Sequence, residues 1–89
     1  MKINENFILK TIAGASVVIP VGEAASEIRG MITLNETAEL IWKELDAGSD
    51  YDGILAKLKS EYNAEESVLK EDLDAFLNKL KEKNILLDD

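Results

Sequence analysis

The sequence predicts an α+β fold in which three short antiparallel β-strands precede three α-helices. Runs rich in β-branched residues lie ahead of Asn35, whereas after it apolar residues recur every three or four positions, the period of an α-helix. With 89 residues, 46% of them hydrophobic, the chain can build one packed core. We therefore expect a single domain that spans residues 1–89.

The first two predicted strands form a hairpin. Residues Phe7 to Ile12 make a β-rich run, and Ala13-Gly14-Ala15 breaks it in a way that suits a tight turn. The return strand covers Ser16 to Pro20, where three consecutive β-branched residues favour an extended backbone because their side chains are stiff at χ1. Pro20 cannot donate a hydrogen bond to a neighbouring strand, so the strand should end there.

A loop over Val21 to Arg29 and a third strand over roughly Gly30 to Leu34 are predicted next. This strand leads directly into the first helix. Asn35 suits the N-cap position, because its side chain can accept a hydrogen bond from an otherwise unpaired N–H group of the first turn.

The first helix is predicted from about Glu36 to Asp46, and Gly48 closes it, since glycine readily adopts the left-handed conformation found after helices. Its apolar residues share one face, which we expect to carry Trp42 into the core. The members of that face are Ala38, Ile41, Trp42 and Leu45.

Two further helices complete the chain. The second begins after Ser49, where Ser49-Asp50-Tyr51-Asp52 fits the capping-box pattern in its looser Asp form, and the third begins after Asn63 and can be capped by Asn84. Their apolar stripes are Tyr51, Ile54, Leu55, Leu58 and Tyr62, and Leu69, Leu73, Phe76, Leu77 and Leu80. The tail Ile85-Leu86-Leu87 is expected to pack beneath the helices. A small sheet joined to three short helices is the anatomy of a winged helix-turn-helix module, here with the sheet first.

The residue types that most enzymes use for nucleophilic or zinc chemistry are missing. The chain has no cysteine and no histidine, which excludes disulfides, thiolate or histidine metal sites and Ser-His or Cys-His nucleophile pairs. Carboxylates alone could hold magnesium or calcium, but the sequence has no Asp-x-Asp-x-Asp-Gly loop. We expect no enzymatic activity, no metal and no cofactor.

The charge pattern bears on partners. The net charge is −8, and no segment has an excess of basic residues. A nucleic-acid-binding protein normally needs a positive face to displace counterions from phosphates, so nucleic acid is not an expected partner. The N-terminal residues Met1 to Asn6 lack the apolar core of a signal peptide, and no apolar run approaches the length of a membrane span. We expect a cytoplasmic protein with no membrane partner.

Three stretches carry a resemblance to a known family. They are Gly30-Met31-Ile32-Thr33-Leu34-Asn35-Glu36-Thr37-Ala38 with Ile41-Trp42-Lys43-Glu44-Leu45, then Asp72-Leu73-Asp74-Ala75-Phe76-Leu77-Asn78-Lys79-Leu80, and the closing Ile85-Leu86. This pattern of about a dozen positions resembles the PqqD family, also known as the recognition element of pathways that modify ribosomally synthesised peptides. The resemblance covers nearly the whole chain, from the first strand to the tail.

The resemblance implies a non-catalytic binding domain with this strand-then-helix arrangement. Members of the family hold the leader segment of a precursor peptide and deliver it to a modifying enzyme, often a radical S-adenosylmethionine enzyme. In the family, the leader adds as a strand to the third strand and packs against the third helix. The positions of this sequence that match are Ile28, Arg29, Met31, Ile32, Thr33, Leu34, Leu69, Asp72, Leu73, Phe76 and Lys79.

Each matched residue also has a structural explanation. Leu73 and Phe76 belong by spacing to the core, and one of them could line a groove as well. Asp72 could cap or pair locally, and Lys79 could belong to a solvated face that complements the helix dipole. Arg29, the only arginine, offers a planar fork for a peptide carboxylate, although a loop arginine with no role is equally common.

Three other functions compete with peptide binding. A winged-helix DNA-binding regulator would share the fold but needs a basic recognition helix. An acyl or peptidyl carrier protein would share the size and acidity, but it needs a serine at a helix start, and the nearest candidate, Ser49-Asp50-Tyr51, has the usual Asp-Ser order reversed. A stand-alone enzyme would need a nucleophile and a base that the chain does not supply.

A homodimer formed through the third strand would compete with a peptide for the same edge.

Overall fold

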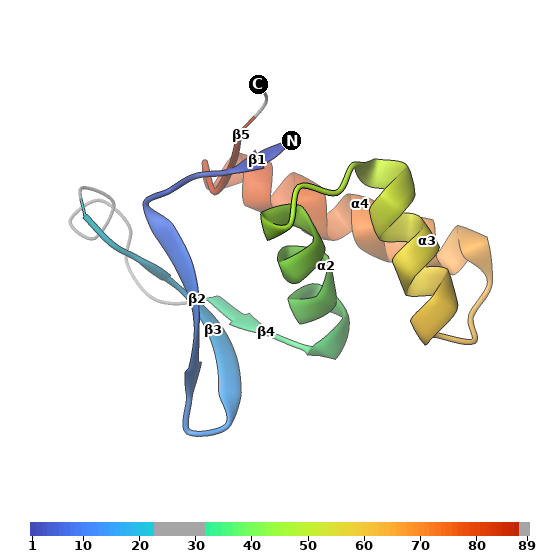
Figure 1. Cartoon of the computed structure of the whole chain (residues 1–89), viewed down its shortest axis with the longest axis horizontal. Coiled ribbons are helices and arrows are strands. Elements are labelled where there is room, and N and C mark those ends of the chain that lie inside the picture. Colours follow the sequence, from blue (N-terminus) through green and yellow to red (C-terminus); the bar gives the residue numbers. More distant parts are fainter. Residues whose placement is uncertain (23–31, 88–89) are drawn as a thin grey trace.

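The computed structural model describes residues 1–22 and 32–87. A three-stranded sheet lies at one end of the molecule and three helices at the other (Figure 1). The elements in chain order are β1 (Lys2–Ile3), β2 (Phe7–Ile12), β3 (Ala15–Pro20), β4 (Ile32–Leu34), α2 (Glu36–Asp46), α3 (Tyr51–Glu61), α4 (Glu66–Glu82) and β5 (Leu86–Leu87). The prediction of three antiparallel strands followed by three helices is confirmed.

The sheet has the order β2-β3-β4, and both pairs are antiparallel. Ile12 pairs with Ala15, so the hairpin turn contains two residues, Ala13 and Gly14, with φ of 52° and 81°. Positive φ at both positions identifies a type I′ turn, whose twist matches that of the flanking strands. Glycine adopts this conformation without strain, whereas at Ala13 the Cβ atom makes it energetically unfavourable.

The inner face of the sheet packs on α2. Leu9 pairs with Val18, and Val18 pairs with Ile32, so residues from all three strands lie side by side on this face. Phe7, Val18 and Leu34 are buried there in one cluster with Trp42 of α2. The expectation that Trp42 belongs to the core is confirmed, since it is 3% exposed.

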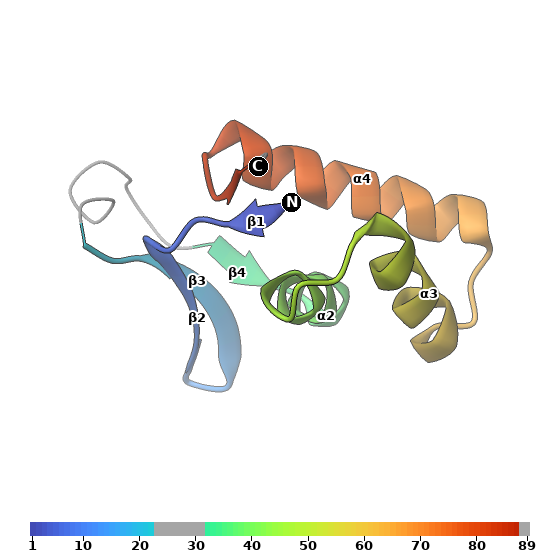
Figure 2. The same ribbon diagram turned by 45° about the horizontal axis from the view of Figure 1, so that its top comes forward.

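The three helices enclose the larger part of the core. Helix α2 lies between the sheet and α3, and α4 runs alongside both α2 and α3 (Figures 1 and 2). Each helix contributes leucine or isoleucine residues that are almost fully buried, among them Ile41, Ile54, Leu58, Leu73 and Leu80.

The ends of α2 form as predicted. Asn35 Oδ1 accepts a hydrogen bond from the backbone N–H of Ala38 at 2.8 Å. Gly48 follows the helix with φ of 91°, its N–H donates to the carbonyl of Leu45, and the N–H of Ser49 donates to that of Glu44. These two bonds make a Schellman motif, which pairs carbonyl groups that the end of a helix otherwise leaves free.

The predicted start of the second helix is corrected by one residue. Asp50, not Ser49, is the N-cap of α3, because Asp50 Oδ1 accepts a hydrogen bond from the N–H of Gly53 at 2.8 Å. Ser49 is already engaged by the end of α2, where its hydroxyl donates to Glu44 Oε1 at 3.2 Å. The sequence contains both candidate N-caps, Ser49 and Asp50, but it does not show that Ser49 is hydrogen-bonded to the end of the preceding helix.

The predicted start of the third helix is also corrected. Glu65 is the N-cap of α4, and its side chain makes no capping hydrogen bond, so Asn63 lies outside the helix. At the other end Asn84 adopts a φ of 58°, and the N–H groups of Asn84 and Ile85 donate to the carbonyls of Lys81 and Leu80. The expected cap at Asn84 is therefore confirmed as a second Schellman motif.

The expected packing of the C-terminal tail is confirmed for Ile85 and Leu86, which are 0% and 3% exposed in the core, and the structure adds a strand pairing that was not predicted. Leu86 and Leu87 form β5, which pairs with β1, so that segments from opposite ends of the sequence lie side by side (Figure 1). Asn4 reinforces this junction, because its N–H donates to the carbonyl of Ile85 at 2.8 Å and its side chain donates to that of Asn84 at 2.9 Å. The small second sheet closes one end of the core over Ile85, which is fully buried.

Candidate peptide-binding site

Strand β4 is an edge strand in the part of the chain that the structure describes. It pairs with β3 on one side, and no other described strand lies on its opposite side. Its side chains alternate, with Leu34 buried, Ile32 half-buried and Thr33 exposed on the outer face. An edge of this kind offers backbone N–H and C=O groups to an extended segment of another chain.

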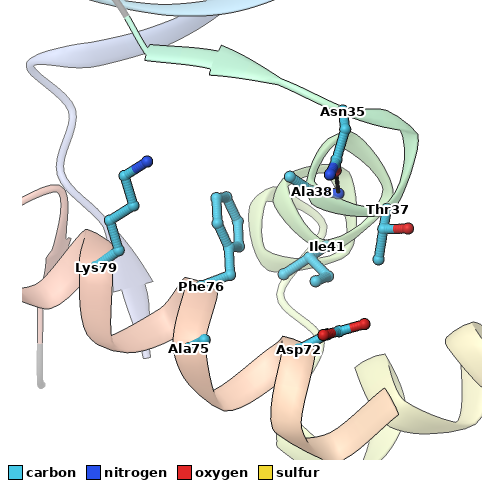
Figure 3. Close-up of a pocket in the computed structure, with 8 residues that line it drawn as sticks. All are labelled: Asn35, Thr37, Ala38, Ile41, Asp72, Ala75, Phe76 and Lys79. Atoms are coloured by element: carbon cyan, nitrogen blue, oxygen red, sulfur yellow. Dashed lines mark hydrogen bonds between the residues drawn. The ribbon is translucent and has the colours of Figure 1, made fainter. Parts of the chain in front are cut away.

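A groove opens where β4 ends. It lies between the N-terminal turn of α2 and one face of α4, and its volume is about 320 Å³ (Figure 3). The side chains that line it come from these two helices: Asn35, Thr37, Ala38, Ile41, Asp72, Ala75, Phe76 and Lys79.

One face of helix α4 forms one wall of the groove. The residues on that face are spaced three or four positions apart, which places them on the same side of the helix. Asp72, Phe76 and Lys79 project from the same side of the helix, and Ala75 keeps that side low between them. Phe76 rises from the centre of the wall and is half-buried against the core, while Asp72 and Lys79 are exposed at its two ends. The groove thus has an apolar middle and ends of opposite charge.

Helix α2 supplies the other wall with its first turns. The Asn35 cap fixes the direction in which the chain leaves β4, so that Thr37, Ala38 and Ile41 face the groove. Figure 3 shows Thr37 and Ile41 on the side of α2 turned toward Asp72. The wall is therefore held by the same junction that ends the edge strand.

Carboxylates at the start of α2 shape the local electrostatics. Glu36 and Glu39 lie in its first turn, where they complement the partial positive charge of the helix N-terminus. Hydrogen bonds from Lys43, at 3.1 Å, and from Ser16 of β3 lower the pKa of Glu39 below its ordinary value. This carboxylate connects α2 to the central strand of the sheet.

The structure separates the predicted site residues into four groups. Asp72, Phe76 and Lys79 line the groove, and Ile32, Thr33 and Leu34 form the edge strand that leads to it. Leu69 and Leu73 are 3% and 0% exposed and lie in the core, behind the groove rather than on its surface. Three more, Ile28, Arg29 and Met31, fall outside the described residues. A peptide contact by any of the eleven remains a prediction.

Five groove residues were not predicted as site residues: Asn35, Thr37, Ala38, Ile41 and Ala75. From the sequence, Asn35 is predicted to cap α2, and Ala38 and Ile41 are predicted to lie in the core. Their helical periodicity alone cannot distinguish a buried position from one at the rim of a groove. Their position in the sequence was the available signal. When a helix directly follows an edge strand, the residues of its first turns lie next to that edge and can line a groove there.

Metal and membrane features can be assessed over residues 1–22 and 32–87. In those ranges there is no group of three or more acidic, histidine or cysteine side chains placed to hold a metal ion. Nor does a helix there combine the length and apolar character needed to cross a bilayer.

Comparison with known proteins gives one family and two similar structures. Over residues 25–86 the sequence matches the family described as coenzyme PQQ synthesis protein D (PqqD). The first structure is of TbiB1 in complex with the TbiA(beta) leader peptide, with a TM-score of 0.82, 23% identity and full coverage of both chains. The second is of lasso peptide synthetase B1 complexed with the leader peptide, with a TM-score of 0.79 and 24% identity over 98% of this chain and 96% of that one. At these identities the likeness shows the fold alone. Curated proteins gave no match.

Proposed function

This chain belongs to the PqqD family, and we propose that it is a non-catalytic domain that binds the leader segment of a ribosomally synthesised precursor peptide. In this proposal the domain acts in the cytoplasm and presents the precursor to a modifying enzyme, such as a radical S-adenosylmethionine enzyme. The two similar structures support the first step, since each of those proteins is complexed with a leader peptide.

The observation that carries the proposal is the open edge of β4 beside the groove. A leader peptide added to this edge would form backbone hydrogen bonds with Ile32, Thr33 or Leu34, which give affinity with little dependence on sequence. Alternate side chains of such a peptide point to the same face of the sheet, so one set of them would enter the groove and contact Phe76. Affinity and specificity would thus come from two neighbouring parts of one surface.

The charge of α4 argues against DNA binding as an alternative. This helix carries three lysines and five carboxylates, whereas a recognition helix that enters a major groove needs a basic face. No feature of the described residues favours DNA over a peptide.

Strand addition can be tested on the peptide, which leaves the protein fold untouched. A binding peptide is first enriched from a displayed library of random sequences and then resynthesised with a single N-methyl group at each position in turn. In an added strand, N–H groups alternate between pointing at the neighbouring strand and pointing away. We therefore expect affinity to fall by about tenfold or more at alternate positions only, because each modification there removes a hydrogen bond and introduces a clash. Uniform loss, or no loss at any position, would refute strand addition.

The same peptide tests whether copies of this chain pair through β4 in competition with a ligand. If copies of this chain pair through β4, the peptide must displace one copy to bind, so sedimentation should show dimers that dissociate as peptide is added. A dimer that persists when the peptide is saturating uses a different surface.

A further inference from the structure

The two charged ends of the groove give it a direction. We infer that the groove selects an extended peptide segment that has a basic side chain beside Asp72, an apolar side chain on Phe76 and an acidic side chain beside Lys79, in that order from N- to C-terminus. This inference rests on the proposed function and specifies the peptide that the site accepts.

Helix geometry sets the spacing. Asp72 and Lys79 are seven positions apart on α4, which corresponds to about 10 Å along the helix axis. An extended chain covers that distance in about three residues. Because only alternate side chains of an added strand face the groove, the set that matches this spacing is i, i+2 and i+4, which spans about 13 Å. The long side chains of lysine and arginine can take up the small difference from 10 Å. The preferred segment is therefore basic-x-apolar-x-acidic.

Asp72 and Lys79 are both exposed and both line the groove. Within the described ranges, the side chains of Asp72 and Lys79 form no hydrogen bond or ion pair with each other or with another described residue. Other surface charges are engaged, for example Lys59 with Glu66 at 3.1 Å and Lys57 with Glu61 at 3.4 Å. An exposed charge at each end of an apolar groove is the arrangement that charge complementarity can exploit.

The helix dipole does not account for Asp72. A carboxylate in the first turn of a helix is stabilised by the dipole, but this effect fades beyond that turn. Asp72 is the seventh residue of α4, beyond the first turn, so its exposed carboxylate is a negative charge at this end of the groove that the dipole does not require. At the facing N-terminus of α2, Asn35 caps the N–H of Ala38 and Glu36 adds a negative charge, so little positive charge there would repel a basic side chain.

The order of the two charges follows from the direction of β4. In Figure 3 this strand passes above Lys79 and Phe76 and ends at Asn35, on the Asp72 side of the groove. Both strand pairs of this sheet are antiparallel, and an antiparallel peptide would continue that pattern. Such a peptide runs from the Asp72 end to the Lys79 end, which places the basic residue first.

Charge reversal tests the inference directly. Displayed libraries of random peptides are selected against the full chain and against its Asp72→Lys and Lys79→Glu variants. The matched controls are Glu71→Lys, which makes the same change beside Asp72, and Lys70→Glu, which makes the same change on the opposite side of α4 from Lys79. We expect the natural chain and both controls to enrich basic-x-apolar-x-acidic segments, and each groove variant to invert the preference at its own end.

Titration of one enriched peptide then gives the magnitude. Lys79→Glu should weaken binding roughly three- to tenfold, and replacing the acidic residue of the peptide by lysine should restore it, with both effects shrinking at high salt. Enriched peptides that bind at β4 without a charge preference would overturn this inference and leave the proposed function standing. Acidic-x-apolar-x-basic segments would overturn the antiparallel direction. Failure to enrich any peptide would defeat the proposed function itself.

Discussion

Residues Leu73 and Phe76 show what sequence periodicity resolves and what it does not. Both belong to one apolar stripe of α4, yet Leu73 is fully buried while Phe76 remains half-exposed over the groove. The sequence could predict that both face inward. Which of them lies at the rim depends on how α2 leaves β4, and this is set by tertiary packing and not by the stripe itself.

Truncation should separate their roles. Replacing Leu73 by alanine is expected to lower the free energy of unfolding by about 2–5 kcal/mol, because it leaves a cavity in the core. Phe76→Ala should cost less than Leu73→Ala, since part of the ring is exposed, but should weaken binding of a library-selected peptide by about tenfold. Urea denaturation and calorimetric titration measure the two effects. The assignment of Phe76 to the groove is wrong if its truncation leaves peptide affinity unchanged.

A second residue-scale prediction concerns the hairpin turn. Ala13 has a φ of 52°, a conformation that costs an alanine about 1 kcal/mol, and asparagine is the residue most often found there before glycine in type I′ turns. Ala13→Asn should therefore raise the free energy of unfolding by about 0.5–1 kcal/mol. Thermal denaturation of Ala13→Asn beside Ala15→Asn provides the comparison. Equal effects at both positions would mean that turn conformation is not the cause.

Among the elements, the larger ones follow from the sequence and the smallest do not. The ranges of β2 and α2 match their predictions, because each has a full run of residues with the right period and, for α2, a clear cap. Strands β1 and β5 contain two residues each and pair from opposite ends of the chain. Two residues show no periodicity, and long-range pairing leaves no local signal.

The β1–β5 junction gives an element-scale prediction. Asn4 donates hydrogen bonds to two carbonyls in the segment that follows α4, one from its backbone N–H to Ile85 and one from its side chain to Asn84. Asn4→Ala removes the side-chain bond to Asn84 and the one that Asn4 Oδ1 accepts from the N–H of Asn6, so stability should fall by about 1–2 kcal/mol. Amide exchange should accelerate at Leu86 and Leu87 and remain unchanged in α3. Acceleration spread evenly over the chain would contradict a local role.

The contact between α2 and the sheet predicts a pH dependence. The pKa of Glu39 is lowered in the folded protein from its ordinary 4.5. A carboxyl group whose pKa is lower when folded stabilises the fold above its unfolded pKa, and that stability is lost as the pH falls through the folded pKa. Glu39→Gln should therefore reduce the loss of stability on acidification below about pH 4.5. Urea denaturation at neutral and acidic pH measures this, and a variant that loses as much stability as the natural chain would contradict it.

For the whole molecule, the described part of the sheet leaves two edges, β2 and β4, and they differ in what they border. Strand β2 is longer and exposes Ile8 and Ile12, with Lys10 between them. A lysine in the middle of an edge strand opposes pairing with a second copy of the same strand. Strand β4 borders the groove with its apolar middle and charged ends. The sequence could predict a free third strand, but only the packing of α2 against α4 shows that a shaped surface lies beside it.

Hydrogen–deuterium exchange of the backbone amides, with and without a saturating library-selected peptide, tests strand addition at β4 most directly. Strand addition predicts slower exchange at Ile32–Leu34 on binding and little change at Phe7–Ile12, which serves as the control edge of the same sheet. Protection of β2, or protection confined to α3 while β4 exchanges as before, would contradict it.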